Sequence, residues 1–194
     1  TMLGPDGHFH PFGWSADGRE LVAARLGPND IVALSMASEP APRDVFVPPA
    51  EEGTAGLPVS PDGRWVAYAA NPTGQTEIWV RPYPGPGAPV RVSPGGGAEP
   101  VWARNGRELF YEDPLKGQLM AVSIQAEPEL RFSAPVALFT VREFAFSSQP
   151  PSYDVAADGR FLMIRPAGNV APGTRPLTVV LNWAEELRRA TEGR

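Results

Sequence analysis

Short apolar runs of strand length recur along the whole chain and alternate with stretches rich in glycine, proline and acidic residues. Runs of this kind, bounded by turn-forming residues, predict β-strands. One set of runs occupies residues 20–24, 65–69, 108–111 and 161–164. A second set follows after another turn-rich stretch, at residues 30–34, 77–80, 119–124 and 177–181. More polar runs at residues 44–47, 89–93 and 136–141 predict outer edge strands.

A turn signature precedes each run of the first set. It consists of Asp or Asn, then Gly, then Arg, and it begins at Asp17, Asp62, Asn105 and Asp158. Glycine accepts positive φ without a Cβ clash, so Asp-Gly and Asn-Gly favour tight hairpin turns. Each signature therefore predicts a hairpin whose second strand is the apolar run that follows it.

The four signatures are spaced by 45, 43 and 53 residues, about the length of a propeller blade of four short strands. One such sheet cannot bury both of its faces alone, so repeated sheets must stack on one another. We predict an all-β chain, residues 1–194 forming a single β-propeller region with about four blades of four-stranded antiparallel sheet. The predicted repeats are residues 11–48, 56–93, 99–141 and 152–183, followed by a short helix at 184–190. A β-sandwich is the alternative, but it does not explain why the same turn neighbourhood recurs.

One stretch of the second repeat carries a family resemblance. The sequence from Pro58 to Tyr68 reads Pro-Val-Ser-Pro-Asp-Gly-Arg-Trp-Val-Ala-Tyr and resembles the repeat of TolB-like β-propellers. The residues that end at Trp14 and Trp102 resemble it too, and the resemblance covers nearly the whole chain. The departures from the family pattern are Ala16 and Ala157, which replace the usual proline just before the turn signature, and Asn105, which replaces its Asp. The resemblance implies a location outside the cytoplasm, which the residues themselves do not address.

The number of repeats is smaller than the resemblance implies, because propellers of this kind have about six or seven blades. Three arrangements are open: a piece of a longer propeller, a closed four-bladed ring in which residues 1–11 complete the last sheet, or two chains that pair their open edges as halves of a dimeric ring. Residues 177–187 are similar to the closing segment of propeller regions in bacterial proteins, including kinase-linked sensor proteins. Exposed strand edges invite pairing. We therefore expect a homo-oligomer or a fragment of a longer chain.

The composition narrows the classes of partner. The 194 residues include 17 basic and 22 acidic side chains, a net charge of −5, so no broad basic face is offered to nucleic acid. The chain contains no cysteine, which excludes disulfides and cysteine-ligated zinc. No apolar run approaches the roughly 18 to 20 residues that a membrane span requires. We expect neither a nucleic-acid partner nor a membrane span in this chain.

Two groups of residues have the chemistry of metal ligands. Asp6, His8 and His10 alternate along the chain near its amino terminus, and alternate residues of an extended segment project to one side. The glycines and proline around them predict an ordinary loop instead. Glu99 and Asp154 flank predicted innermost strands, where propeller lactonases hold a divalent cation with oxygen ligands. Calcium or zinc would be the ion of such a site, although we expect no cofactor.

The aromatic residues fall into two groups. Those at repeating strand positions, such as Trp65 and Trp79, are expected to be largely buried between blades. Tyr83, Phe144 and Phe146 lie in predicted loops and are candidates for an exposed binding surface. We therefore expect a non-catalytic propeller module that binds or senses a protein or peptide. The alternative is a metal-dependent hydrolase of a lactone or another ester.

Overall fold

The computed structural model describes residues 2–4, 7–25, 31–36, 42–46, 58–72, 74–125, 129–145 and 151–165. Within these ranges the regular structure is entirely β-strand, and the strands of each sheet pair antiparallel, which confirms the predicted fold class. The strand expected at 177–181 and the helix expected at 184–190 lie outside the described residues. Across the described ranges, no helix has the length and apolarity that crossing a membrane requires.

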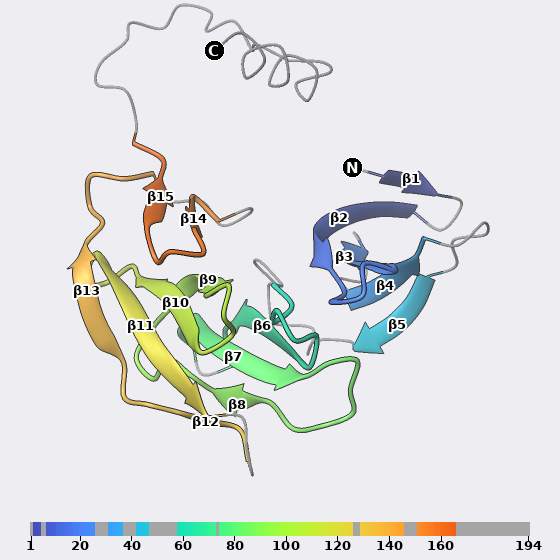
Figure 1. Cartoon of the computed structure of the whole chain (residues 1–194), viewed down its shortest axis with the longest axis horizontal. Coiled ribbons are helices and arrows are strands. Elements are labelled where there is room, and N and C mark those ends of the chain that lie inside the picture. The colour runs from blue at the N-terminus through green and yellow to red at the C-terminus, as the bar shows by residue number, and fades with distance from the viewer. Residues whose placement is uncertain are drawn as a thin grey trace, which may run out of the picture.

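The first sheet contains five strands in the order β1-β2-β3-β4-β5 (Figure 1). They are β1 (Met2–Gly4), β2 (Gly7–Trp14), β3 (Glu20–Arg25), β4 (Ile31–Ser35) and β5 (Pro42–Phe46). The pairing of β1 with β2 contradicts the loop expected near the amino terminus. Without β1, the outer edge of β2 would leave its backbone N–H and C=O groups unpaired. Strand β1 runs along this edge and pairs with it.

The next two sheets follow the predicted repeats. The second sheet contains β6 (Trp65–Ala70), β7 (Glu77–Pro82) and β8 (Val90–Arg91), and its inner position is reduced to a single bridge between Val59 and Val66. The third contains β9 (Ala98–Trp102), β10 (Glu108–Asp113), β11 (Gln118–Gln125), β12 (Arg131–Phe132) and β13 (Val136–Thr140). Both β12 and β13 pair with β11, so the outer edge of this sheet is shared between two strands.

The fourth sheet is described only in part, as the hairpin of β14 (Tyr153–Val155) and β15 (Phe161–Met163). It lies beside the third sheet, and the sheets follow one another around an arc in chain order (Figure 1).

The four turn signatures form the predicted hairpins. Their glycines all have positive φ, at 68°, 71°, 70° and 81° for Gly18, Gly63, Gly106 and Gly159. The side-chain oxygen of the preceding Asp or Asn accepts a hydrogen bond from the backbone N–H of the following Arg, at 3.1, 3.1, 2.8 and 3.2 Å. The motif therefore recurs because one side chain and one glycine conformation close each turn.

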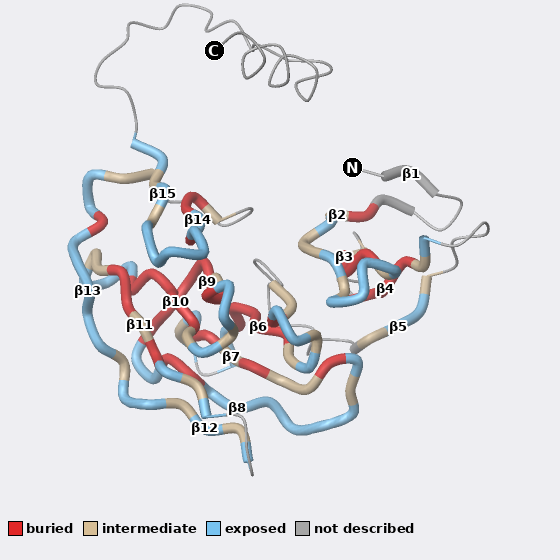
Figure 2. The backbone as a smooth tube through the Cα atoms, in the orientation of Figure 1, coloured by how far each residue is buried: buried red, intermediate tan, exposed pale blue. Residues whose placement is uncertain are grey.

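Buried residues concentrate along the central strands (Figure 2), and their apolar side chains form clusters that join consecutive sheets. One cluster joins the first sheet to the second and contains Val22, Ile31, Val66 and Tyr68. A larger one joins the second to the third and is built around residues such as Ile78, Val80, Leu109 and Val122. A third cluster, with Phe110, Leu119, Tyr153 and Val155, joins the third sheet to the fourth. The second and third sheets thus bury both of their faces against neighbouring sheets, as stacked repeats require.

The tryptophans are less uniformly buried than their repeating positions predict. Trp102 is 6% exposed, whereas Trp65 and Trp79 are partly buried, and the indole Nε1 atom of each is buried. Trp14, the last residue of β2, is 53% exposed. Trp65 packs at the margin of the second cluster and Trp79 at the margin of the first.

Candidate binding site

A pocket of about 410 Å³ lies beside the third sheet, at the end where β10 turns into β11. Pro114 and Gly117 of this turn line it, together with Glu112 from the end of β10. The chain that leaves β13 closes the other side with Val141, Arg142 and Phe144. The pocket is therefore built by a turn and a connection that are both anchored on one sheet.

Backbone and side-chain hydrogen bonds hold the turn in place. The Asp113 carboxylate accepts hydrogen bonds from the backbone N–H groups of Leu115 and Lys116 at 3.1 and 3.0 Å, and from the Lys116 ammonium at 2.8 Å. These bonds lower the pKa of Asp113, although burial opposes them. Gly117 has a φ of 63°, and its carbonyl accepts the N–H of Val141 at 2.9 Å, which ties the connection to the turn.

Arg142 lies across Gly117. A Cβ atom at position 117 would come within 2.6 Å of Arg142 Cγ, so the close approach requires glycine. The Arg142 guanidinium donates a hydrogen bond to the carbonyl oxygen of Lys116 at 2.9 Å, while its side chain remains exposed. This contact places a positive charge at the rim of the pocket.

Glu112 is the unusual residue of the pocket. The residue is 4% exposed, and its Oε1 atom is buried without a hydrogen-bond partner among the described residues. Burial, and secondarily the charge of Glu99, raises the pKa of Glu112 to about 7. A buried carboxyl with an unsatisfied oxygen is costly unless a partner is supplied, so this side chain is the chemical centre of the candidate site.

Glu99 lies behind Glu112 and connects the third sheet to the fourth. Its carboxylate accepts hydrogen bonds from the backbone N–H and the hydroxyl of Ser152 at 2.6 and 2.8 Å, and its carbonyl accepts the Tyr153 hydroxyl at 2.8 Å. Glu99 has a φ of 51°, a conformation that a non-glycine residue seldom adopts. Burial and the charges of Glu112 and Glu99 raise the pKa of Tyr153 well above its usual value. Glu99 is thus held by protein donors, whereas Glu112 is not.

The predicted metal ligands do not come together within the described residues. Asp154 points away from Glu99: it is exposed and pairs with Arg104 at 3.1 Å, because successive side chains of a strand face opposite sides and its neighbours Tyr153 and Val155 are the buried ones. His10 is half-buried on β2, whereas Asp6 and the side chain of His8 lie outside the description. No group of three or more His, Asp or Glu side chains suited to a metal forms among the described residues.

Glu112 is not among the predicted site residues, because the apolar run that predicts this strand ends at residue 111. The signal was the pair of acids, Glu112 and Asp113, that closes this run just before a Pro-containing turn. Phe144, which was predicted, does line the pocket and packs against the apolar cluster between the third and fourth sheets. Phe146 lies outside the described residues.

Solved structures with the same arrangement of sheets are β-propellers. TolB from Acinetobacter baumannii matches with a TM-score of 0.61 at 15% identity, over 86% of this chain and 40% of its own. A protein assigned as TolB from Agrobacterium tumefaciens matches with a TM-score of 0.56 at 21% identity, over 79% of this chain and 52% of its own. The chain has the TolB-like β-propeller fold. Each sheet is therefore a blade, and the pocket lies where the third blade passes to the fourth.

Other propellers share the fold as well. A protein assigned as a 6-phosphogluconolactonase from Bacteroides uniformis matches with a TM-score of 0.53 at 18% identity, over 83% of this chain and 50% of its own. The chain thus spans about half the length of these three propellers. No protein-family model matches the sequence, and no curated protein sequence matches it either.

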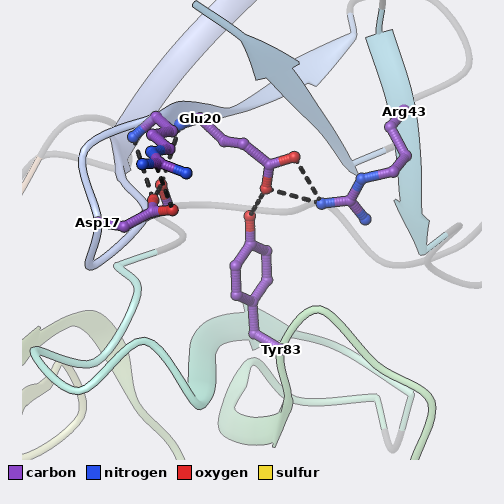
Figure 3. Close-up of polar contacts among 6 residues, drawn as sticks. Asp17, Glu20, Arg43 and Tyr83 are labelled. Atoms are coloured by element: carbon purple, nitrogen blue, oxygen red, sulfur yellow. Dashed lines mark hydrogen bonds and ion pairs between the residues drawn. The ribbon is translucent and has the colours of Figure 1, made fainter.

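Tyr83 joins the first two blades and is not part of an exposed binding surface. The prediction of exposure is wrong, because the residue is 7% exposed and packs in the cluster between these blades. Its hydroxyl donates a hydrogen bond to the Glu20 carboxylate at 3.2 Å, and Arg43 donates to both oxygens of the same carboxylate at 2.9 and 2.7 Å (Figure 3). Burial and the charge of Glu20 raise the pKa of Tyr83 to about 12.

Tyr83→Phe should lower the free energy of unfolding by about 1 to 2 kcal/mol, because it removes a hydrogen bond to a partly buried carboxylate. Urea denaturation monitored by tryptophan fluorescence measures this. The matched control is Tyr111→Phe on β10, which deletes the hydroxyl of an equally buried tyrosine that makes no such bond to a carboxylate, and it should change stability by less than about 0.5 kcal/mol. Equal losses of stability in the two variants would show that the hydrogen bond from Tyr83 to Glu20 does not contribute to the free energy of unfolding.

Proposed function

We propose that the chain is a non-catalytic propeller module that binds a protein or peptide, and that the binding site is the pocket beside the third blade. The observation that carries this proposal is the Glu112 carboxyl, which lines the pocket with one buried oxygen unsatisfied by the described residues. Buried polar groups in proteins nearly always have a partner. A ligand whose binding exposes this oxygen would donate the hydrogen bond that is missing.

The surroundings of Glu112 suit a peptide. The pocket volume of about 410 Å³ accommodates one side chain of a partner. Val141 and Phe144 offer apolar contact, and the connection that carries them is tied to the turn of the same blade. A connection positioned in this way on a rigid scaffold is where binding residues are usually found. A location outside the cytoplasm, expected from the resemblance to TolB-like propellers, belongs to the same proposal.

Peptides selected on the intact protein from a random displayed library test this function. We expect the selected peptides to bind Phe144→Ala about tenfold more weakly than the unaltered chain, because truncating a central aromatic side chain of an interface costs about 1 to 2 kcal/mol. Phe132→Ala is the matched control, since Phe132 is also half-buried but lies on β12, away from the pocket. Failure to select any peptide, or equal affinity for both variants, would contradict the proposal.

A hydrolase of a lactone or another ester is the second candidate. The raised pKa of the Glu112 carboxyl favours this candidate, because a group whose pKa is about 7 can act as a general acid or base near neutral pH. Ester hydrolysis that disappears in Glu112→Gln would favour this candidate, whereas hydrolysis that persists would point away from Glu112.

A further inference from the structure

We infer that β15 pairs with β14 in two registers that differ by one residue, of which the structure shows one. In the second register Leu162 and Ile164 lie between the third and fourth blades, in the places that Phe161 and Met163 occupy in the structure. Three features carry this inference: the length of the turn before β15, the exposure of its side chains and their chemistry.

The hairpin turn before β15 is one residue shorter than the other three turns that carry the same signature. In the first three blades, the residue two places before the Asp or Asn donates its backbone N–H to the carbonyl three places after it. These bonds join Ser15 to Glu20, Ser60 to Trp65 and Ala103 to Glu108, at 2.8, 2.8 and 2.9 Å. In the fourth blade Ala156 donates to Arg160, only two places after Asp158, at 2.8 Å. A shift of one residue turns every following side chain to the opposite face of the sheet.

The exposure of the side chains after this turn shows the reversal. In the first three blades the residues four and six places after the Asp or Asn are buried. They are Leu21 and Ala23, Val66 and Tyr68, and Leu109 and Tyr111. The corresponding residues of the fourth blade, Leu162 and Ile164, are 73% and 57% exposed. Phe161 and Met163 pack against the apolar cluster of the third blade in their place.

Hydrophobic burial does not select one register over the other. Residues 161–164 read Phe-Leu-Met-Ile, so each register buries two large apolar side chains and exposes two, and these four types gain similar free energies on burial. Edge-to-face contacts of Phe161 with Phe110 and Phe139 favour the observed register. The longer turn, which the same signature forms in three blades, favours the second. Register is set by the alternation of apolar and polar residues, which this strand lacks, so the two registers are close in free energy.

The register of β15 also determines how one wall of the pocket is held. Ala145 follows the pocket residue Phe144 and donates its backbone N–H to the Ile164 carbonyl at 2.8 Å. Phe144 packs against the same apolar cluster as Phe161 and Met163. A shift of one residue moves the Ile164 carbonyl and takes Phe161 and Met163 out of this cluster. The second register therefore weakens the support of Phe144.

Cysteine pairs measure the two registers, because the chain has no cysteine of its own. Asp154→Cys with Leu162→Cys joins residues that face each other in the observed register, and Asp154→Cys with Met163→Cys joins those that face each other in the second. Both pairs lose the ion pair of Asp154 with Arg104, so this loss affects them equally. After equilibration in one glutathione buffer, mass spectrometry gives the oxidised fractions. We expect both disulfides, with equilibrium constants within about a hundredfold of each other.

Ala156→Ser should shift the balance towards the second register. Ser15 and Ser60 occupy the corresponding position, and their Oγ atoms accept the backbone N–H three places after the Asp, at 2.9 and 3.0 Å. This bond suits the longer turn, so the ratio of the 154–163 to the 154–162 disulfide should rise roughly fivefold, the effect of one hydrogen bond. Hydrogen exchange of the Ala145 amide should accelerate by a similar factor in the chain without cysteines. Ala103→Ser is the matched control, because its blade already has the longer turn, and it should change neither quantity.

Absence of the 154–163 disulfide, or a ratio of the two disulfides that Ala156→Ser leaves unchanged, would overturn the second register. If the ratio shifts while exchange of the Ala145 amide does not, the coupling to the pocket wall is rejected. The exchange measurement uses no cysteine, so it still decides the question if a cysteine pair prevents folding. In that case, an Ala145 amide that exchanges equally in Ala156→Ser and in the unaltered chain rejects the inference.

Discussion

Leu109→Ala should lower the free energy of unfolding by about 3 to 4 kcal/mol. Leu109 lies on β10 and is 0% exposed, in the largest of the apolar clusters, between the second and third blades. Its neighbours across the sheet, Trp102 and Val122, are on strands held by their own backbone hydrogen bonds. They cannot collapse fully into the space of three missing carbon atoms, so the loss combines lost burial with a residual cavity.

The matched control for this prediction is Leu115→Ala. Leu115 lies in the turn after β10 and is 71% exposed, so the same substitution should change stability by less than about 0.5 kcal/mol. Urea denaturation of both variants, followed by fluorescence and by circular dichroism, measures the difference. A loss below about 1 kcal/mol in Leu109→Ala would mean that the second and third blades do not share a packed core.

Glu112→Gln should stabilise the protein at alkaline pH by roughly 2 to 3 kcal/mol. The folded-state pKa of Glu112 is raised from 4.5 to about 7. Between these values the folded chain keeps a proton that the unfolded chain has released, so raising the pH favours unfolding. Each pKa unit corresponds to about 1.4 kcal/mol, which makes the penalty on the order of 3 kcal/mol once the pH exceeds about 7. Glutamine carries no charge and avoids this penalty.

The pH dependence distinguishes this effect from ordinary repacking. The advantage of Glu112→Gln should be fully present at about pH 8 and should vanish as the pH falls to about 4.5, where the carboxyl is protonated in the folded chain and increasingly in the unfolded chain. Denaturation midpoints measured across this range test it, with Glu108→Gln as the control that should show no such trend. A stability difference that is independent of pH would mean that burial does not raise the pKa of Glu112 in the folded chain.

The local structure of the blades follows from the sequence. Asp62 and Gly63 close their hairpin with contacts inside the turn itself, a backbone N–H bound to the Asp carboxylate and a glycine at a φ of 71°. The apolar residues after the turn, from Val66 to Ala69, then form a strand whose two faces are buried. Signals of this kind lie within a few residues of one another, so they can be read without knowledge of the fold, and their recurrence at blade length indicates the propeller.

The site depends on neighbours that are distant in the sequence, and only the tertiary structure decided it. Glu99 and Asp154 both looked suited to a cation, but the alternation along β14 turns Asp154 outwards, and the donors of Ser152 already occupy the Glu99 carboxylate. Tyr83 is in a segment rich in proline and glycine, yet packing of the first blade on the second buries it against Glu20. The charge state of Glu112 depends in the same way on Glu99 from another strand. Burial and electrostatic coupling are properties of the packed blades, because they depend on which surfaces meet and not on the order of residues along one strand.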